Sequence, residues 1–406
     1  MGGPVSQRHI VVGVCGGIAA YKVLELLRLL TKEGAIVDVI LTKNATNFIT
    51  ALSIEALTHR RPYIGMFDPL ISPYAHIELG QSSDLFLIAP ATANIIGKIA
   101  NGIADDLLTT AVLAATAPVL LCPSMNEKMF LNPLVQHNLS KLKAMGYHVM
   151  EPESGELACG ATGLGRLPEP QEILEEISSL LSPKDLKGIR CLVTAGPTRE
   201  FADPVRFISN PSSGKMGYAL ARAAAHRGAE VILISGPTHL SPPKGVKLVK
   251  VISTLQMRDA VMAEARRSDL IIKAAAVSDF RPKVAFEHKI KKDTKPLIME
   301  LEKNPDILRE LGELKREHNF ILVGFAAESQ DLVANAQKKL LGKNLDVIVA
   351  NDIKMEGAGF GVDTNQVKII VKDQGILDSG LRPKDEIAHL ILDKVKELLG
   401  ELHGGP

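Results

Sequence analysis

The chain has 406 residues, of which 46% are hydrophobic and 23% charged, as expected of a globular protein with room for two domains. Its 47 basic and 46 acidic residues leave a net charge of +1, so the composition gives no general affinity for nucleic acid or an anionic membrane. The first residues lack an apolar signal segment, and the apolar region 107–122 is too short to span a bilayer, so we expect a cytoplasmic protein.

The first half of the chain alternates apolar runs with helical patterns. Residues 9–14 predict a buried strand, residues 13–17 a glycine-rich turn, and residues 18–32 a helix that ends at Gly34. The pattern continues with strands at 37–42, 85–89, 118–122 and 147–150, and with helices from about 46, from 92, at 105–115 and at 133–145. Strands separated by helices indicate a parallel, doubly wound sheet, which binds ligands at the carboxyl ends of its strands.

Three loops would meet at that edge of the sheet: 13–18, 90–94 (PATAN) and 123–126 (PSMN). Their small and amide side chains would let a flat polar ligand approach closely. The first loop has the pattern GxxGG, which is a weak signal and lacks the third glycine of the dinucleotide fingerprint. By themselves, these loops indicate a mononucleotide or a flavin.

Two further segments of the first half carry reactive side chains. His76 lies in residues 72–78, which we predict to be a loop ahead of the next strand, and a lone histidine is usually structural or on the surface. Residues 153–167 are rich in glycine and lack periodicity, so we expect a mobile flap that contains Cys159. The four cysteines, at 15, 122, 159 and 191, lack the paired spacing of a zinc site or disulfide framework, so reduced thiols are expected.

A second nucleotide-type unit begins in mid-chain, in the segment 191–217, CLVTAGPTREFADPVRFISNPSSGKMG. A strand at 191–195 leads through the turn Gly196-Pro197 into a long polar loop and then into a helix at 218–225. Such a crossover brings backbone N–H groups and the positive end of a helix to an anion. Residues 178–188 follow a helix and carry Ser and Pro, so we place the boundary there, between domains 1–181 and 182–406.

The rest of the second half repeats the alternation of strands and helices. Strands are predicted at 231–235, 248–251, 270–274, 320–323, 346–350 and 366–371. Helices are predicted at 254–267 and 384–399, and a further helix carries Lys339 and ends near Lys343. Another helix is predicted to start at Asn304 as its N-cap, with Pro305 in the first helical position. Asp279 follows the strand 270–274, where a carboxylate could equally accept ribose hydroxyls or cap a turn. Lys289 belongs to the basic cluster 288–292, which is usually a solvated face but can neutralise a triphosphate.

Several of these motifs resemble those of a known family. TAGPTRE at 194–200, with DPVRFISNPSSGKMG at 203–217, resembles the ligase domain of the bifunctional coenzyme A biosynthesis flavoproteins, and GFAAES at 324–329 is similar to that family's GFAAET. PATAN and PSMN resemble the PASAN and PxMN motifs of flavin-dependent cysteine decarboxylases, with Thr92 in place of serine. SPxxHIEL around His76 and ACG around Cys159 match that family too, and the resemblance covers residues from about 8 to 400.

The resemblance implies two doubly wound α/β domains, a flavodoxin-like flavoprotein domain followed by a Rossmann-like ligase domain. In the first domain it implies FMN contacts at Gly16, Gly17, Ile18, Thr42, Asn44, Thr92, Asn94, Ser124 and Met125. It also implies that His76 takes a proton from phosphopantothenoylcysteine, that Asn126 holds the substrate carboxylate, and that Cys159 donates a proton late in the decarboxylation. A neutral amide suits that task, because a cation would hold the carboxylate too firmly before it reacts.

In the second domain the resemblance implies CTP-dependent ligation of L-cysteine to 4′-phosphopantothenate through an acyl-CMP intermediate. The implied CTP contacts are Ala274, Ala275, Ala276, Asp279, Lys289, Asn304, Pro305, Asp306, Ile307, Phe325, Lys339 and Lys343. Arg206 and Asn210 would bind phosphopantothenate, and Asn210 and Lys289 would be catalytic. Mg²⁺ would accompany CTP, with no protein ligands predicted. The chain would form a homo-oligomer with trimeric flavin domains and dimeric ligase domains.

Two other classes of function compete with this interpretation. A pyridine-nucleotide oxidoreductase with two Rossmann units is disfavoured, because GxGxxG with an acidic residue about 20 positions later is missing. A non-catalytic flavin-binding regulator is disfavoured because His76, Asn126 and Cys159 are all present beside an intact ligase half. The sequence therefore favours a bifunctional enzyme that acts on small molecules.

Overall fold

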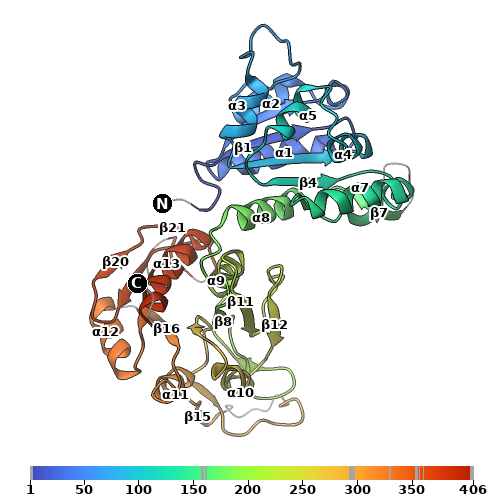
Figure 1. The fold of residues 1–406 in the computed structure, drawn as a ribbon. Coiled ribbons are helices and arrows are strands. Elements are labelled where there is room, and N and C mark those ends of the chain that lie inside the picture. Colours follow the sequence, from blue (N-terminus) through green and yellow to red (C-terminus); the bar gives the residue numbers. More distant parts are fainter. Residues whose placement is uncertain are drawn as a thin grey trace. The chain divides into compact units, whose positions relative to one another are not determined.

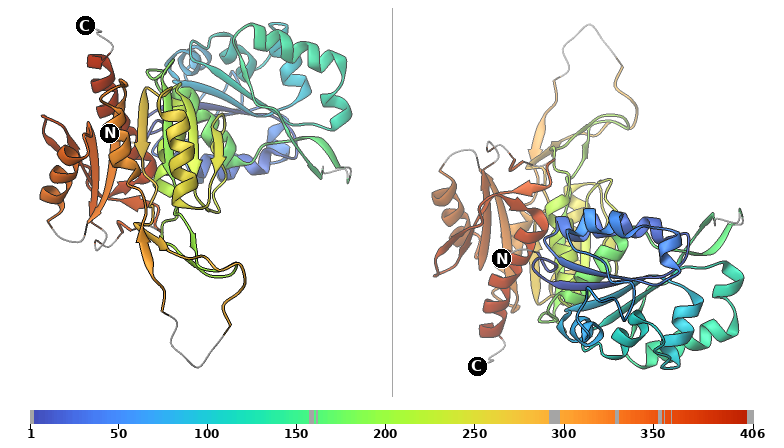
Figure 2. Two further views of the ribbon diagram at one scale, coloured as in Figure 1. Left: turned by 90° about the horizontal axis from the view of Figure 1, so that it is seen from below. Right: turned by 90° about the horizontal axis from the view of Figure 1, so that it is seen from above.

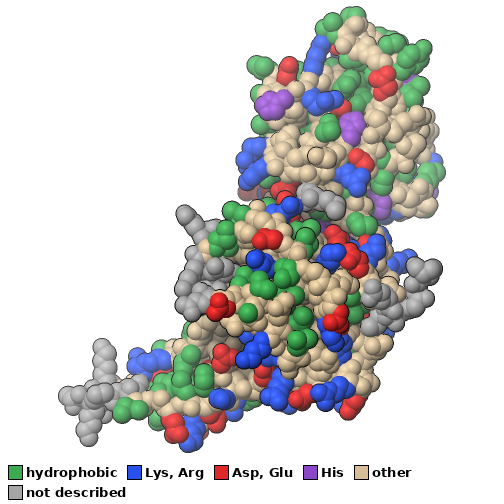
Figure 3. Space-filling view, turned by 90° about the vertical axis from the view of Figure 1, so that its left-hand side faces the viewer, with side chains coloured by type: hydrophobic (Ala, Val, Ile, Leu, Met, Phe, Trp, Pro, Cys, Tyr) green, Lys and Arg blue, Asp and Glu red, His purple; other side chains and the backbone are tan. Residues whose placement is uncertain are grey.

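The computed structural model of the chain describes residues 3–156, 160, 162–291, 298–328, 331–352, 355, 357–359 and 361–402 (Figure 1). It divides into two compact units, residues 1–182 and 183–406, one residue beyond the predicted boundary. Within the described ranges, no helix is long and apolar enough to cross a membrane. On the face seen in Figure 3, basic and acidic side chains are interspersed, in keeping with the net charge of +1.

Unit 1 is built on a parallel sheet of five strands, counted over its described residues, in the order β2-β1-β3-β4-β5. The strands are β1 (His9–Val14), β2 (Ile36–Leu41), β3 (Leu85–Ala91), β4 (Val119–Pro123) and β5 (His148–Val149). This is the strand order of flavodoxin-like folds, in which the crevice between the carboxyl ends of β1 and β3 is the switch point that binds ligands.

Helices cover both faces of this sheet (Figure 1). They are α1 (Ala20–Lys32), α2 (Ala51–Thr58), α3 (Ala75–Ser82), α4 (Ala93–Ala100), α5 (Leu107–Leu113), α6 (Glu127–Phe130), α7 (Pro133–Ala144) and α8 (Pro170–Leu181), with a 3₁₀ turn at Ala45–Asn47. Helix α1 buries Val23, Leu26, Leu27 and Leu30, a spacing that turns one helical face to the core. Those side chains pack on one face of the sheet, whereas Val11 of β1 packs on the other with α4 and α5. The strands are therefore apolar on both sides.

Unit 2 contains a larger sheet of eight strands among its described residues, in the order β12-β11-β8-β13-β16-β17-β19-β20. The strands are β8 (Arg190–Ala195), β11 (Glu230–Ser235), β12 (Lys247–Lys250), β13 (Leu270–Lys273), β16 (Ile321–Glu328), β17 (Val347–Asp352), β19 (Val367–Val371) and β20 (Ile376–Asp378). Neighbours from β12 to β17 are parallel, and β19 and β20 add an antiparallel edge. The six parallel strands follow the Rossmann order, with the switch point between β8 and β13.

Two sets of helices cover the faces of the second sheet. Helices α9 (Lys215–His226) and α13 (Lys384–Leu402) pack on one face, and α10 (Thr254–Ala265), α11 (Ile307–Leu314) and α12 (Leu332–Gly342) on the other. Short antiparallel pairs lie in the loops: β9 (Glu200–Phe201) with β10 (Phe207–Ile208), β14 (Phe280–Pro282) with β15 (Leu301–Lys303), and β18 (Thr364–Asn365) with β21 (Arg382–Pro383). Helix α9 lies very close to β8, because a Cβ at Gly217 would be only 2.6 Å from that of Ala195.

The prediction that His76 lies in a loop was wrong, because His76 is the second residue of α3. The turn before this helix is joined to it by Ser72, whose hydroxyl accepts a hydrogen bond from the Tyr74 N–H and donates one to Glu78. Pro73 lies just ahead of this helix, where a proline is compatible with helix initiation.

Residues 153–167 were predicted as a flap without regular structure, and this was also wrong for the part that the structure describes. β6 (Glu153–Glu156) pairs with β7 (Thr162–Arg166) in an antiparallel hairpin. Glycines at several positions hid the alternation that marks a strand, since glycine has no side chain to bury. Cys159 lies outside the described residues.

Several boundaries in unit 2 differ from prediction, and two of the differences bear on the site. Helix α11 begins at Ile307 with Asp306 as its N-cap, which accepts a hydrogen bond from the Arg309 N–H at 3.1 Å, so Asn304 is not the cap. The strand predicted at 320–323 continues to residue 328, because it pairs with β17 from Val323 to Glu328.

A buried polar cluster lies at the carboxyl end of α9. Arg227 is 1% exposed and donates hydrogen bonds to both oxygens of Asp185 and to Asp393 of α13, which ties three segments together. Burial lowers the pKa of His226 to about 4, and the charges of Arg222, His389 and Lys184 act in the same direction. Burial also lowers the pKa of His389.

We expect unit 2 to lose stability in mild acid because of this cluster. In the unfolded chain His226 is protonated below about pH 6.5, whereas in the folded protein it is protonated only below about pH 4. The unfolded state therefore binds more protons between these values, and stability falls as the pH drops through that window. The shift corresponds to roughly 3 kcal/mol for His226, at about 1.4 kcal/mol per pKa unit. Urea unfolding followed by far-UV circular dichroism from pH 7 to pH 4 measures this, and His226→Gln should flatten the dependence. An equally steep dependence in the variant would contradict the assignment.

Candidate active sites

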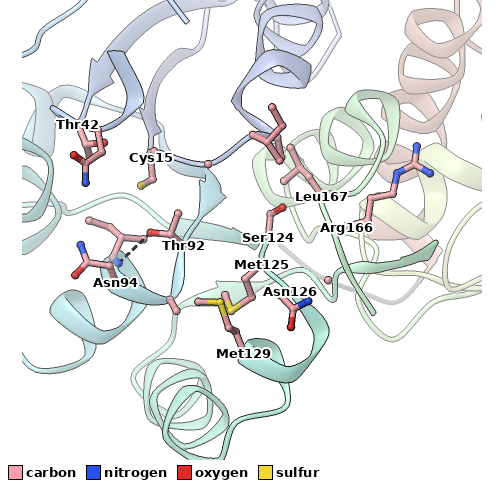
Figure 4. A pocket seen from close by; sticks show the side chains of 18 of the residues that line it. Cys15, Thr42, Thr92, Asn94, Ser124, Met125, Asn126, Met129, Arg166 and Leu167 are labelled. Carbon is pink, nitrogen blue, oxygen red and sulfur yellow. Dashed lines mark hydrogen bonds between the residues drawn. The ribbon is translucent and has the colours of Figure 1, made fainter. Parts of the chain in front are cut away.

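A cavity of about 1150 Å³ opens at the carboxyl ends of the strands in unit 1. Its wall is formed by the loops after β1, β2, β3 and β4 and by the β6–β7 hairpin (Figure 4). The predicted residues on this wall are Gly16, Gly17, Ile18, Thr42, Asn44, Thr92, Asn94, Ser124, Met125 and Asn126. Folding thus gathers four separate loops at the switch point, around a space large enough for a mononucleotide.

The loops after β1 and β2 touch at Gly16. A Cβ at this position would lie 2.4 Å from the Cβ of Asn44 and 2.8 Å from its carbonyl carbon, so only glycine fits without movement of the backbone. The Thr42 N–H donates a hydrogen bond to the Val14 carbonyl at 3.0 Å, which joins the ends of both strands. Because Gly16 and Gly17 lack side chains, the backbone of this turn and the start of α1 remain accessible to an anion.

The loops after β3 and β4 use their polar side chains to begin helices. The Thr92 hydroxyl accepts a hydrogen bond from the Ile95 N–H at 3.4 Å and caps α4 (Figure 4). The Asn126 side-chain oxygen accepts one from the Lys128 N–H at 2.9 Å and caps α6. Capping fixes the orientation of the Asn126 amide at the cavity wall.

The β6–β7 hairpin is held against the loop that carries Asn126. The Met125 N–H donates to the Gly165 carbonyl at 3.0 Å, and the Leu164 N–H donates to the Glu127 carboxylate at 3.0 Å. Gly165 has φ +145°, and a Cβ there would lie 2.0 Å from the Met125 oxygen. This close contact requires glycine.

Sequence reasoning missed several residues of the cavity wall, notably Tyr21, Lys22, Lys98, Asp106, Met129 and Arg166. Lys98 pairs with Asp105 at 2.6 Å, and this hydrogen bond raises the lysine pKa. Lys22 and Arg166 pair with the same carboxylate, Glu169, at 2.8 and 2.6 Å, and the bond from Lys22 lowers the pKa of that carboxyl. Lys22 follows the glycine turn by one helical turn, the sequence signal that could have identified it.

His76 is not among the residues that line this cavity. It is half buried on α3, beside the exposed side chains of Tyr74 and Ile77. The described residues of one chain thus bring Asn126, but not His76, to the cavity wall.

In unit 2, three loops converge on the turn after β8. The Ala276 N–H donates to the Gly196 carbonyl at 3.0 Å, and a Cβ at Gly236 would lie 1.8 Å from the Pro197 oxygen. The Asn210 side chain donates to the Ala276 carbonyl at 2.6 Å. Asn210 and the predicted segment 274–276 therefore lie together at the switch point.

Arg206 lies in a tight turn with Asp203, to which it donates at 2.6 Å, and it also donates to the Ile290 carbonyl at 3.1 Å. Burial raises the pKa of Asp203, but hydrogen bonds from the backbone N–H groups of Val205, Ile290 and Arg206 outweigh it and lower the pKa to about 2. The anionic Asp203 thus anchors the end of the segment that carries Lys289. Figure 2 shows that segment, in light orange, projecting beside the β9–β10 hairpin.

Four of the other predicted nucleotide residues are joined in two pairs near the amino end of α11. Lys343 pairs with Asp306 at 2.7 Å, and the Asn304 N–H donates to the Asp279 carbonyl at 2.8 Å. Lys273, which sequence reasoning missed, lies near this group: burial lowers its pKa to about 8, and the charge of Lys343 contributes. Phe325 on β16 is half buried, and Lys339 lies on α12. In the parts of the chain that are described, no cluster of three or more His, Cys, Asp or Glu side chains is arranged to hold a metal.

Comparison with known proteins agrees with this division. Residues 3–182 match the family model "Flavoprotein", and residues 186–399 match "DNA/pantothenate metabolism flavoprotein C-terminal domain". The chain is 48% identical to the coenzyme A biosynthesis bifunctional protein CoaBC of Bacillus subtilis (strain 168), over 97% of this chain and 98% of that protein. It is 46% identical to the protein of that name from Vibrio cholerae serotype O1, over 97% and 99%. It is also 46% identical to a cysteine/cysteine sulfinic acid decarboxylase of an unknown prokaryotic organism, over 86% and 99%.

Fold and sites together define a flavoprotein in which a flavodoxin-like unit is fused to a Rossmann-like unit. The near full-length identity is more specific than this class. The chain belongs to the family of coenzyme A biosynthesis bifunctional proteins, and it is a bifunctional enzyme of that pathway.

Proposed function

We propose that unit 2 ligates L-cysteine to 4′-phosphopantothenate at the expense of CTP, and that unit 1 decarboxylates the resulting phosphopantothenoylcysteine with FMN. The enzyme is thus a phosphopantothenate–cysteine ligase and a phosphopantothenoylcysteine decarboxylase. The order follows from the chemistry, since the carboxyl group that is lost belongs to the cysteine that the ligase adds. The observation that carries the proposal is the identity of 48% over 97% of the chain.

The cavity of unit 1 suits FMN in size and in donors. The close contact at Gly16 requires glycine, and neither Gly16 nor Gly17 has a side chain that would cover the backbone. The backbone of residues 16–18 would therefore hold the phosphate, with Thr42 and Asn44 beside it. Thr92, Asn94, Ser124 and Met125 would contact the rest of the cofactor. When bound, FMN would supply the redox chemistry that oxidises the cysteinyl carbon next to sulfur and so provides an electron sink for loss of carbon dioxide.

The side chains of the enzyme would position the substrate and move protons. The capped amide of Asn126 would orient the substrate carboxylate without neutralising it, which avoids holding it too firmly before carbon dioxide leaves. His76 would accept a proton in the oxidation step, and Cys159 would return a proton after carbon dioxide has left. Cys159→Ser should therefore release carbon dioxide but accumulate the oxidised product.

Replacing Gly16 by Ala should weaken the binding of FMN. The new Cβ would lie 2.4 Å from the Cβ of Asn44, so the loops after β1 and β2 must separate where the phosphate would bind. Visible absorbance of the purified protein and titration with FMN measure this, and we expect affinity to fall by on the order of 100-fold. Gly97→Ala in α4 is the matched control, since its nearest neighbour would be 3.8 Å away. A Gly16→Ala protein with the same flavin absorbance as the Gly97→Ala control would contradict the assignment.

In unit 2 the phosphopantothenate carboxylate would attack the α-phosphate of CTP and release pyrophosphate. The cysteine amine would then attack the acyl-CMP and release CMP. Both partners in the first step are anions, so we assign charge neutralisation to Mg²⁺ together with Lys289, Lys339 and Lys343. Asp279 and the segment 274–276 would hold the nucleoside, and Arg206 would bind phosphopantothenate.

We further propose that oligomers complete both sites. His76 does not line the cavity of its own chain, which is consistent with a trimeric flavin unit in which it serves the site of a neighbouring chain. In the same way, Lys289 on its projecting segment is consistent with a dimeric ligase unit.

One incubation tests the whole proposal. The protein is mixed with 4′-phosphopantothenate, cysteine, Mg²⁺ and either CTP or ATP, and the products are followed by mass spectrometry. We expect phosphopantothenoylcysteine and then 4′-phosphopantetheine, with CTP preferred. A separate incubation contains free cysteine as the only substrate, because one relative is named a cysteine/cysteine sulfinic acid decarboxylase. Carbon dioxide release from cysteine, without ligation, would refute the proposal.

A further inference from the structure

Glu200 has a buried carboxylate, and the proposed function gives this residue no role in either reaction. The residue is 4% exposed, and its Oε1 accepts two hydrogen bonds from Thr254, one from the N–H at 2.9 Å and one from the hydroxyl at 2.7 Å. Thr254 is the first residue of α10, and its N–H therefore has no partner inside the helix. The carboxylate thus holds the positive end of α10 against the turn after β8.

The carboxylate also sets the direction of a chain of hydrogen bonds. A carboxylate only accepts, so the Thr254 hydroxyl proton points to Glu200, and Thr198 must be the donor in the 3.1 Å contact between the two threonine hydroxyls. The Thr198 oxygen in turn accepts from the Ser278 N–H at 3.0 Å. Both threonines are fully buried, so the bond between their hydroxyls is shielded from solvent.

One branch of this network reaches the proposed nucleotide side. The Asn304 amide donates to the Thr254 hydroxyl at 3.2 Å and to the Ser278 carbonyl at 2.9 Å, and its oxygen accepts from Arg281 at 2.9 Å. The Asn304 N–H donates to the carbonyl of Asp279. The side chain of Asn304 is therefore occupied in holding the loop that carries Asp279.

The other branch reaches the proposed phosphopantothenate side. The Thr198 carbonyl accepts from the Ser209 hydroxyl at 2.7 Å. The next residue, Asn210, donates to the Ala276 carbonyl, which also accepts from the Thr198 N–H at 3.3 Å. A single buried threonine thus links the loop of Asn210 to the loop after β13.

We propose that Glu200 is a positioning residue of the ligase reaction. Through Thr254 and Thr198 it holds the loop of Asp279 and the loop of Asn210 at the separation that nucleotidyl transfer requires. The inference rests on the proposed ligase function. It also makes Asn304 a positioning residue, in place of the direct CTP contact that the sequence led us to expect. A displacement of about 1 Å between reacting groups can cost on the order of 100-fold in rate.

The test uses the full-length protein and two matched pairs of variants. Glu200→Ala and Thr254→Val, which break the network, should lower the ligase kcat by on the order of 10- to 100-fold, with the KM for CTP changed by less than about threefold. Glu200→Gln and Thr254→Ser, which keep an acceptor or a hydroxyl, should restore kcat to within about fivefold of the unsubstituted enzyme. If Glu200→Ala does not fold, the Thr254 pair decides.

Asp269→Ala is the structural control. Asp269 accepts a hydrogen bond from the Arg190 N–H at 2.8 Å at the opposite end of β13, so this variant loses a similar bond away from the site. It should retain its kcat. A normal kcat in Glu200→Ala and Thr254→Val, or an equal loss in Asp269→Ala or in the conservative variants, would overturn the inference. Absence of ligation by the unsubstituted enzyme with both CTP and ATP would instead refute the proposed function.

Discussion

Replacing Asn210 by Asp should lower the ligase rate by on the order of 100-fold or more, about 2.7 kcal/mol in activation free energy. The Asn210 amide donates to the Ala276 carbonyl at 2.6 Å, and a carboxylate cannot donate there. Two oxygens would face each other at that distance, so the loops that carry Asn210 and Ala276 would separate. The added negative charge would also repel the phosphoryl group of the proposed acyl-CMP.

Release of pyrophosphate and of carbon dioxide, measured separately, checks this prediction. Decarboxylation of supplied phosphopantothenoylcysteine should be unchanged and serves as the internal control for folding. Asn210→Ala removes the hydrogen bond without adding charge and should lose less activity. Full ligase activity in Asn210→Asp would remove this residue from the site. Loss of decarboxylation would contradict the division of the two reactions between units 1 and 2.

Replacing His76 by Asn should block the decarboxylase at its first step, by on the order of 100-fold or more, because positioned acid–base groups contribute about that much. In a rapid-mixing experiment the visible absorbance of the oxidised flavin should persist after substrate is added. FMN affinity should be unchanged, because the role proposed for His76 is proton transfer and not cofactor binding.

Mixed oligomers test the proposal that His76 serves a neighbouring chain. Co-expression of His76→Asn with Asn126→Asp, each inactive alone, should restore activity, because about one quarter of randomly assembled interface sites would receive both native residues. If His76 and Asn126 of one chain serve one site, no mixed site is complete. Absence of activity in mixed oligomers that do bind FMN would therefore refute sharing of the site.

The sequence alone was enough for the fold class and for the cavity-lining loops of unit 1. Apolar runs that alternate with helical patterns produce parallel strands, and the carboxyl ends of parallel strands must meet at one edge of the sheet. PATAN and PSMN follow such strands, so their place on a shared cavity wall could be predicted without knowing the order of the strands. The same reasoning holds for Asn210 and the segment 274–276, which follow β8 and β13.

The tertiary structure decided which individual side chains meet. Asn304 resembled a helix cap in sequence, but Asp306 caps α11 while Asn304 is held by Thr254 and Ser278. The pairing of Glu200 with Thr254 joins residues 54 positions apart, and neither has a local pattern that indicates the other. The periodicity of apolar residues in the sequence indicates only that a helix or strand buries one face. Which loops then converge depends on strand order and register, because these determine which distant residues come within hydrogen-bonding distance.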